Sequence, residues 1–365
     1  MLNFFAPINN LGMGVHSLNL IRAYEDLGMM EVCLIPPFGG VTFQDDRISR
    51  WLRNRERFSR NDPSLMIFDI PFFANFSGKP KIGMAVFETD GVTAIQKAAL
   101  RSCDILLTPS QWGRNVLEAA GFTASIVPEG IDPSIFHPDS NTKLRREPVF
   151  FHIGKFEERK GTLSVIRCFA RALEEKEAWL LIHVRNPFLP DWRSRLEDYL
   201  ISLGFKTLDL IDFSRRGLNI RLVSEQEIPV NEIARLYRNV DCGIFPSKGE
   251  GFGLPILECL ASGTPVIAGR WSAMADYLPD NYPAELILKN STIQKAEDGQ
   301  WYHGDRGDWF VPDEEEIVEK IRYVYENART LKESESWRDF VHEIAEEWTW
   351  ANAAKKLDMV LETVM

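Results

Sequence analysis

Two glutamates flank a glycine-rich turn in the segment Glu250-Gly-Phe-Gly-Leu-Pro-Ile-Leu-Glu258. Carboxylates accept hydrogen bonds from hydroxyl groups well, so each glutamate suits a diol such as a ribose or one edge of a hexose ring. Glu250 precedes the turn and Glu258 lies about one helical turn beyond it, so the two carboxylates cannot share one helix face. We expect them to flank one ligand at different depths. The alternative is an ordinary strand–loop–helix connection with two solvated glutamates.

The turn between the two glutamates has the features of an anion site. A strand is expected to end at Pro246, and a helix to open near Leu254, because Pro255 suits a first helical turn, where its missing N–H would have no partner. Free N–H groups and the helix dipole favour negative charge at such an end, and glycine lets a ligand approach the backbone. The N–H groups expected to face a pyrophosphate are those of Phe252, Gly253 and Leu254.

A basic loop, Gly154-Lys-Phe-Glu-Glu-Arg-Lys-Gly161, lies between an expected strand at Val149–Ile153 and an expected helix at Thr162–Glu174. Ligands of α/β proteins bind at the carboxyl ends of parallel strands, which is where this loop begins. Lys155 and Lys160 can both reach a pyrophosphate there and neutralise its charge. The alternative is a charged surface loop.

The first half of the chain offers weaker candidates. Gly12 and Gly14 follow an expected strand at Leu2–Ala6; so short a glycine pair identifies no particular ligand, and a tight turn before a helix is the alternative. His16 can contact an acceptor or a phosphate, but a lone histidine is more often structural.

Two carboxylates follow the next candidate strand in the first half. Glu88 and Asp90 come after an expected strand at Lys81–Phe87, where carboxylates can orient acceptor hydroxyls; an Asp or Thr helix cap is the alternative.

Short apolar runs alternate with helical patterns in both halves, which is typical of β-α-β units and parallel sheets. A stretch rich in proline and polar residues, 128–147, indicates a connection between two domains. The fold class expected is therefore α/β, with two doubly wound domains at 1–143 and 144–335. The region 313–365 is expected to be helical, with a break at 333–336.

The segment from Glu250 to Glu258, continued by Ala261-Ser-Gly-Thr-Pro-Val-Ile-Ala268, resembles the Glu-x7-Glu motif of family 4 retaining glycosyltransferases. The resemblance implies that Glu250 contacts the transferred sugar and Glu258 the nucleotide ribose. It also implies that Lys155 and Lys160 bind the donor phosphates. Arginine is common in the family where this chain has Lys155, so the charge is kept but bidentate geometry is lost.

The same resemblance extends to the first half. It implies that the amides of Gly12 and Gly14 lie near the distal phosphate and the acceptor, and that Ser110 contacts the cleft. Phe87-Glu-Thr-Asp90 is similar to a stretch in one branch of the family, where many relatives have a histidine. Trp348-Thr-Trp350 resembles the start of the family's final helix, so residues 336–365 are expected to pack back on the first domain.

The family implies a GT-B fold, two facing Rossmann-like domains, and transfer of a sugar from a UDP-, GDP- or other nucleoside diphosphate sugar to a hydroxyl acceptor. Retention, no metal requirement and no other cofactor are expected, since Lys155, Lys160 and the amides after Glu250 can supply the positive potential. The acceptor is expected to be a saccharide or lipid-linked saccharide, within glycan or polysaccharide biosynthesis. The resemblance leaves the base, sugar, linkage and acceptor open.

Two other classes of function compete with transfer. A non-catalytic protein that binds nucleotide sugars or glycans would need the same groups. A nucleotide-dependent oxidoreductase would want Gly-x-Gly-x-x-Gly after a strand. The loop at Gly12 and Gly14 continues to Ser17 and has no third glycine at that spacing.

Bulk properties narrow the remaining possibilities. A formal net charge of −11 argues against a general nucleic-acid binder, and five widely spaced cysteines indicate free thiols in a reducing cytosol. No signal peptide or spanning segment is expected, which favours a cytoplasmic protein. The arginine-rich stretch Arg47–Arg60, with Trp51 and Phe58, is compatible with peripheral contact on the inner membrane face, but a solvated surface helix is the simpler interpretation.

Overall fold

The computed structural model describes residues 1–37, 40–43, 45–139, 147–224 and 228–363, which form two compact units. Unit 1 comprises Met1–Ile131, Asp305–Gly307 and Glu347–Met365. Unit 2 comprises Asp132–Gly304 and Asp308–Glu346. The expected boundary at 143/144 falls at 140–146, outside the described residues.

Unit 1 contains a parallel sheet whose described strands follow the order β2-β1-β3-β4-β5-β6. The chain runs from β1 to β2 on one side and continues with β3 on the other, so the strand order reverses between β1 and β3. Most strand residues are buried, as expected for a sheet covered on both faces. The strands are β1 (Leu2–Phe5), β2 (Val32–Leu34), β3 (Ser64–Ile67), β4 (Lys81–Met84), β5 (Ile105–Thr108) and β6 (Ser125–Ile126).

Four of the described helices of unit 1 begin with a side-chain cap, the last of these caps being Thr349 before Trp350. The carboxylate of Asp45 accepts from the N–H of Ile48, and Thr93 forms a capping box with Gln96. Ser110 caps the next helix. The helices are α1 (Gly12–Asp26), α2 (Asp46–Arg53), η1 (Asn54–Arg57), η2 (Ile70–Asn75), α3 (Ala94–Leu100), α4 (Gln111–Ala119) and α11 (Trp350–Glu362), where η marks a 3-10 helix.

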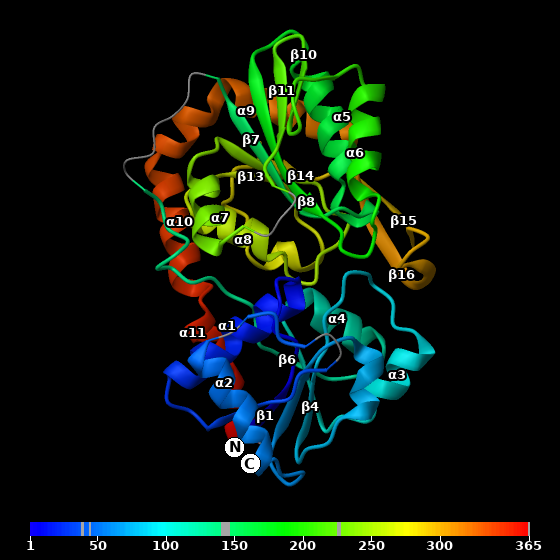
Figure 1. Ribbon diagram of the computed structural model, residues 1–365, viewed down its shortest axis with the longest axis vertical. Coiled ribbons are helices and arrows are strands. Elements are labelled where there is room, and N and C mark those ends of the chain that lie inside the picture. Colours follow the sequence, from blue (N-terminus) through cyan, green and yellow to red (C-terminus); the bar gives the residue numbers. More distant parts are fainter. Residues whose placement is uncertain (38–39, 44, 140–146, 225–227, 364–365) are drawn as a thin grey trace. The chain divides into compact units, whose positions relative to one another are not determined.

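Unit 2 contains a mixed sheet in the order β14-β13-β12-β7-β8-β11-β10-β9, parallel from β14 to β11 and antiparallel at the β10 and β9 edge. Figure 1 shows β7, β8 and β11 running side by side. The strands are β7 (Val149–Lys155), β8 (Ala178–Arg185), β9 (Lys206–Thr207), β10 (Asp212–Arg215), β11 (Leu218–Leu222), β12 (Cys242–Phe245), β13 (Val266–Gly269) and β14 (Ile287–Leu288).

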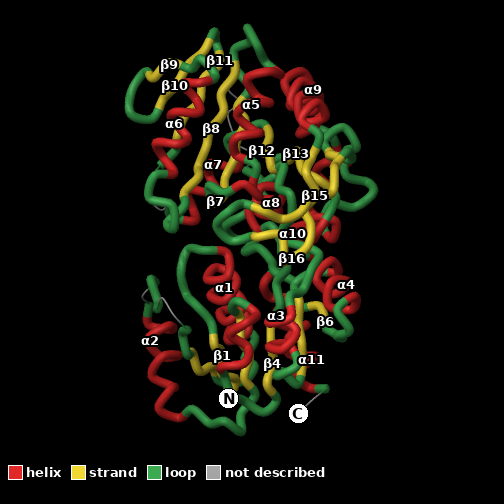
Figure 2. Tube along the Cα trace, turned by 90° about the vertical axis from the view of Figure 1, so that its right-hand side faces the viewer, coloured by secondary structure: helices red, strands yellow, loops and turns green. Residues whose placement is uncertain are grey.

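The helices of unit 2 pack around this sheet; α5 lies against α9, and α8 against β12 and β13. Its helices are η3 (Glu158–Lys160), α5 (Thr162–Ala172), α6 (Trp192–Ser202), α7 (Val230–Arg238), α8 (Leu254–Ala261), η4 (Ser272–Asp276), α9 (Glu314–Glu333) and α10 (Glu335–Glu347). β15 (Ser291–Glu297) and β16 (His303–Pro312) form a separate antiparallel ribbon, which Figure 2 shows as two neighbouring strands.

The C-terminal helices divide between the units. In α10, Trp337 and Phe340 pack their rings against Tyr282 of unit 2, and the indole N–H of Trp337 donates to the carbonyl of Gly263. α11 packs against α1 in unit 1, where Tyr24 donates to Asp358. The part of the chain that returns to the first unit therefore begins at Glu347, later than the expected 336.

Candidate functional site

The strand order of unit 2 reverses at β7, because β8 and β11 lie on one side of it and β12 and β13 on the other. Such a switch point is where open α/β sheets bind ligands, beyond the carboxyl ends of the strands. Lys155 ends β7, the loop that follows it carries Arg159 and Lys160, and the loop after β12 carries Glu250. Gly161, at φ 72°, ends the first loop, and a side chain there would lie 3.2 Å from Pro246 of the second.

Ion pairs, buried at Glu250 and Arg159 and half-buried at the lysines, link five residues that we call the Glu250 cluster: Lys155, Glu157, Arg159, Lys160 and Glu250. Lys160 Nζ donates to both oxygens of Glu250, at 2.7 and 2.8 Å. Arg159 Nη1 donates to Glu250 Oε2 at 3.0 Å and to the carbonyl of Gly249 at 2.7 Å. The carboxylate is thus held between two cations, with a side chain only 5% exposed.

The electrostatics of the Glu250 cluster keep this carboxylate ionised. Burial raises the pKa of Glu250, but the charges of Lys160 and Arg159 outweigh burial and lower the pKa to about 2. The guanidinium of Arg159 also pairs with Glu157, at 2.6 Å. A buried carboxylate held in this way has both its charge and its direction fixed.

Lys155 lies in a different environment from Lys160. Its ammonium pairs with Glu157 Oε2 at 2.7 Å and lies over the rings of Phe188 and Trp301, at 5.9 and 5.6 Å from their centroids. Within the described residues, no ion pair joins Lys155 to Glu250. Lys160 therefore contacts the Glu250 carboxylate directly. Lys155 joins the same cluster only through its ion pair with Glu157.

The backbone of Glu250 is anchored from both sides. Its N–H donates to the hydroxyl of Ser272, at 3.0 Å, and its carbonyl accepts from the N–H of Ala273. Ser272 adopts φ 49°, a backbone conformation that a residue with a side chain rarely takes. Trp271 donates from its indole to the carbonyl of Ser247 and stacks on Phe310 of β16. The hairpin thus supports the loop that carries Glu250.

The glycine-rich turn has the expected form at the start of α8. Gly253 is the N-cap residue with φ 95°, and Pro255 lies in the first turn. Tyr277 fixes the turn by donating to the carbonyl of Phe252, at 2.9 Å. A side chain at Gly253 would come within 2.6 Å of the Tyr277 hydroxyl. The first N–H groups of the helix, including that of Leu254, have no acceptor inside the helix and can bind an anion.

Glu258 lies in the second turn of α8 and is half-buried. It accepts a hydrogen bond of 3.3 Å from the hydroxyl of Tyr237, whose pKa is raised by burial and then by the charge of Glu258. Glu250 and Glu258 are thus separated by the helix start, with different surroundings for each carboxylate.

His152 ties β7 to its neighbours beneath the Glu250 cluster. Its Nδ1 donates to the carbonyl of Ile244, at 2.7 Å, and its Nε2 lies 3.0 Å from the hydroxyl of Thr162. Burial lowers its pKa to about 4, so the ring is neutral near pH 7. It fixes the position of the basic loop relative to β12.

In unit 1, Gly12 and Gly14 have different roles at the start of α1. A side chain at Gly14 would come within 2.3 Å of the Asn9 side chain and 2.4 Å of its carbonyl, so the close packing of the turn requires glycine there. A side chain at Gly12 would meet no atom within 4 Å. Gly12 therefore leaves open space in front of the helix.

His16 is buried, with 1% exposure, inside unit 1. Its Nδ1 lies 3.2 Å from Glu129, and its ring packs 5.7 Å from that of Trp350 in α11. This environment favours the structural interpretation of His16. Nothing among the described residues accepts from or donates to its Nε2.

The remaining expected residues of unit 1 lie in the segments that follow β5 and β4. Ser110 is fully buried, and its hydroxyl accepts from the N–H of Gly113 as the cap of α4. Glu88 is half-buried and Asp90 exposed, after β4. The cap of α3 is Thr93, so neither Glu88 nor Asp90 serves as that cap.

The arginine-rich stretch packs as a surface helix. Arg47 and Arg50 each pair with Glu25 at 2.7 Å, and Trp51 is fully buried while donating to Glu25. The buried tryptophan cannot serve as an exposed anchor, which favours the simpler interpretation of this helix. Among the described residues, no helix is both long and apolar enough to cross a membrane.

Sequence reasoning missed three residues of the site: Arg159, Glu157 and Ser272. Arg159 and Glu157 lie within the basic loop that was predicted to bind phosphate. The position of that loop was the only sequence signal that could have pointed to these two residues. Nothing local in the sequence indicates that Ser272 reaches Glu250. In the described part of the chain, no three His, Cys, Asp or Glu side chains are grouped to hold a metal ion.

The part of the chain that carries this arrangement is similar to a known protein family. Residues 147–327, which include the whole Glu250 cluster, match the model of the family described as glycosyl transferases group 1. This part of the chain belongs to glycosyl transferases group 1.

Relatives of the chain include a bacterial and a viral glycosyltransferase. The lipopolysaccharide core biosynthesis mannosyltransferase LpcC of Rhizobium leguminosarum bv. viciae is 26% identical over 217 residues, which cover 57% of this chain and 54% of LpcC. A putative glycosyltransferase 45 of the Sulfolobus islandicus filamentous virus is 23% identical over 309 residues, covering 81% of this chain and 78% of the viral protein. The chain thus spans about half the length of LpcC.

Solved structures show that the chain has the GT-B fold. The Anabaena protein Alr3699/HepE, solved in complex with UDP-glucose, superposes with a TM-score of 0.68 at 14% identity, covering 99% of both chains. At this identity the likeness establishes the two Rossmann-like domains and not the substrate.

Proposed function

We propose that this protein is a retaining glycosyltransferase that moves a sugar from a nucleoside diphosphate sugar to a hydroxyl acceptor in glycan or polysaccharide biosynthesis. The observation that carries the proposal is the buried Glu250 carboxylate, held by Lys160 and Arg159 at the switch point of unit 2. Membership of residues 147–327 in glycosyl transferases group 1 supports the same reaction class.

The donor pyrophosphate is proposed to bind between the basic loop and the start of α8. Lys160 directs two contacts to Glu250, and an ammonium has three N–H donors, so one donor remains for a phosphate oxygen. The first N–H groups of α8 supply further positive potential without a metal. In this arrangement Glu250 orients the Lys160 ammonium and accepts from a sugar hydroxyl, while Glu258 accepts from the ribose.

The proposed reaction exchanges one bond at the anomeric carbon for another. The bond from that carbon to the phosphate oxygen breaks, and the acceptor oxygen forms the new bond on the same face. The acceptor proton passes to the departing phosphate, so the products are a glycoside and a nucleoside diphosphate. Stabilising the departing charge is the main task of the Glu250 cluster and the helix start.

Substitution within the Glu250 cluster tests the proposal. Lys160→Ala and Glu250→Gln are each expected to reduce turnover of the cognate sugar nucleotide by about 100-fold or more, as loss of one charge-stabilising group does. Lys206→Ala, an exposed lysine of β9 in the same unit, serves as the control. Near-normal turnover in either cluster variant, with a folded protein, would contradict the assignment.

The cognate donor is found first by screening sugar nucleotides for thermal stabilisation, because a bound ligand raises the unfolding midpoint by mass action. Proton NMR of the product's anomeric coupling then distinguishes retention from inversion. Full activity in the presence of EDTA is expected. Binding without transfer to any hydroxyl acceptor or to water would favour a non-catalytic binding protein instead.

A further inference from the structure

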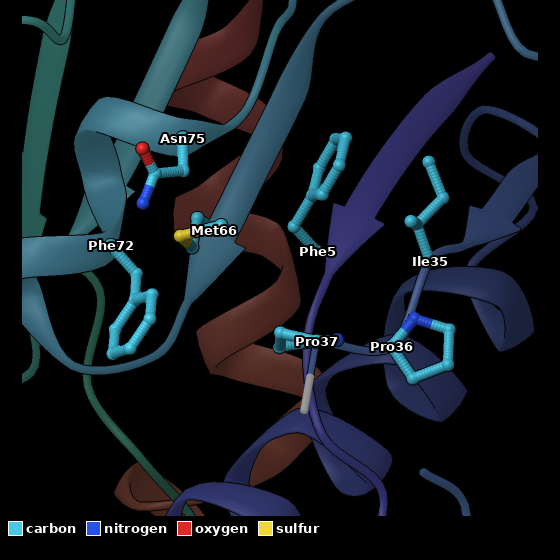
Figure 3. A pocket seen from close by; sticks show the side chains of 7 residues that line it. All are labelled: Phe5, Ile35, Pro36, Pro37, Met66, Phe72 and Asn75. Atoms are coloured by element: carbon cyan, nitrogen blue, oxygen red, sulfur yellow. The ribbon is translucent and has the colours of Figure 1, made fainter. Parts of the chain in front are cut away.

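A pocket of about 320 Å³ opens beside the carboxyl ends of the first three strands of unit 1. Six of its lining residues are apolar, and Asn75 adds an amide. Figure 3 shows Met66, Phe72 and Asn75 on one side and Ile35 and Pro36 on the other. The six apolar residues are Phe5, Ile35, Pro36, Pro37, Met66 and Phe72.

The position of this pocket is that of a binding site. Phe5 ends β1, Ile35 follows β2, and Met66 lies in β3. The strand order of unit 1 reverses between β1 and β3, so the pocket lies at the switch point of this sheet. It is therefore the counterpart in unit 1 of the Glu250 cluster in unit 2.

Packing from behind preforms the pocket walls. The ring of Phe5 lies 5.2 Å from that of Phe76, and Phe72 lies 5.1 Å from Phe68. Met66 is only 3% exposed and belongs to the hydrophobic core. Rigid walls lose little conformational entropy when a ligand binds, which raises affinity for a ligand of matching shape.

The lining also defines the chemistry of the ligand. No charged side chain is among the described residues that line the pocket. A phosphate or a ring of hydroxyls would lose its hydration there without replacement, which costs free energy. Hydrocarbon loses only unfavourable contact with water on entering such a site. The pocket thus has the chemistry opposite to that of the Glu250 cluster.

We propose that this pocket binds a hydrocarbon chain carried by the acceptor. This inference rests on the proposed glycosyl transfer, because only that reaction makes the bound molecule an acceptor. Binding of the hydrocarbon chain itself does not depend on catalysis. It narrows the acceptor to an amphipathic glycoside or lipid-linked saccharide.

Calorimetry with two glucosides tests the pocket directly. n-Octyl β-D-glucopyranoside, below its micellar concentration, is expected to bind the full chain at least about tenfold more tightly than methyl β-D-glucopyranoside, because burying two or three methylene groups accounts for that factor. Asn75→Trp, which places a ring at the rim, is expected to remove this preference. Phe72→Asp should do the same by adding charge.

Asn115→Trp provides the matched control, since Asn115 is an exposed asparagine on α4 and does not line the pocket. It should keep the preference for the octyl compound. Equal affinity for the two glucosides, or octyl binding unchanged in both pocket variants, would overturn the proposal. Octyl binding at the pocket without transfer from any stabilising sugar nucleotide would contradict the proposed function and leave the pocket assignment standing.

Discussion

At the scale of single residues, Glu250 shows how charge and burial act together. Its side chain is 5% exposed, and Lys160 and Arg159 both contact it, so the free energy of folding depends on its ionisation. The sequence predicts that Glu250 contacts a sugar hydroxyl. In the structure, its carboxylate also holds the Lys160 ammonium in place.

The depressed pKa of Glu250 gives a prediction for acid unfolding. The folded pKa of about 2 lies below the pKa of 4.5 of an ordinary glutamate, so the unfolded chain binds the proton more readily. The resulting stability is present above about pH 4.5 and is lost as pH falls towards 2. Between pH 6 and pH 3, Glu250→Gln should lose about 2 kcal/mol less of its unfolding free energy than the unsubstituted protein. Urea unfolding at each pH measures this, and equal losses would contradict the assignment.

At the scale of elements, the start of α1 depends on two glycines for different reasons. Gly14 is packed against Asn9, whereas Gly12 faces open space. Replacing each glycine by alanine therefore separates two effects on the free energy of unfolding: steric overlap in the folded state at Gly14, and restriction of the unfolded backbone at Gly12.

Gly14→Ala is expected to lower the unfolding free energy by at least about 2 kcal/mol, because the added methyl group overlaps the Asn9 backbone. Gly12→Ala should leave stability unchanged or raise it by up to about 1 kcal/mol, since alanine restricts the unfolded chain. Chemical unfolding of the two variants measures the contrast. Similar losses at both positions would show that Gly14 is not tightly packed.

At the scale of the whole molecule, the chain leaves unit 1 at Ile131, contributes Asp305–Gly307 to it, and returns for its last helix at Glu347. The tryptophans of the two last helices pack in different units: Trp337 against Tyr282 in unit 2, and Trp350 against His16 in unit 1. Each is less than a tenth exposed, so each should stabilise its own unit.

Trp350→Ala and Trp337→Ala are each expected to cost about 3–5 kcal/mol, the range for truncating a buried tryptophan. Scanning calorimetry should show Trp350→Ala lowering the unfolding midpoint of unit 1, and Trp337→Ala that of unit 2. Limited proteolysis at intermediate temperature identifies which unit has opened. If both substitutions opened the same unit, the division at Glu347 would not hold.

The sequence determined the local elements and much of the donor loop chemistry. The expected strand at Val149–Ile153 lies within β7, which runs on to Lys155, and β12 ends at Phe245, one residue before the expected end at Pro246. Hydrophobic periodicity and turn residues reflect interactions between residues that are close in the sequence, so they can be recognised from the sequence alone. The hairpin of β15 and β16, whose loop contains the turn residues Asp298-Gly299, and α6 were not expected.

Only the tertiary structure decided which side chains meet. Arg159, rather than Lys155, contacts Glu250, because the η3 turn and Gly161 set the direction of each side chain in the basic loop. His16 and Ser110 are buried, held by Glu129 and Trp350 in one case and by the start of α4 in the other. Such choices depend on packing between segments far apart in the sequence, which no local pattern records. Residue types and spacing thus determined the chemistry available, and long-range packing determined which of those residues carry it.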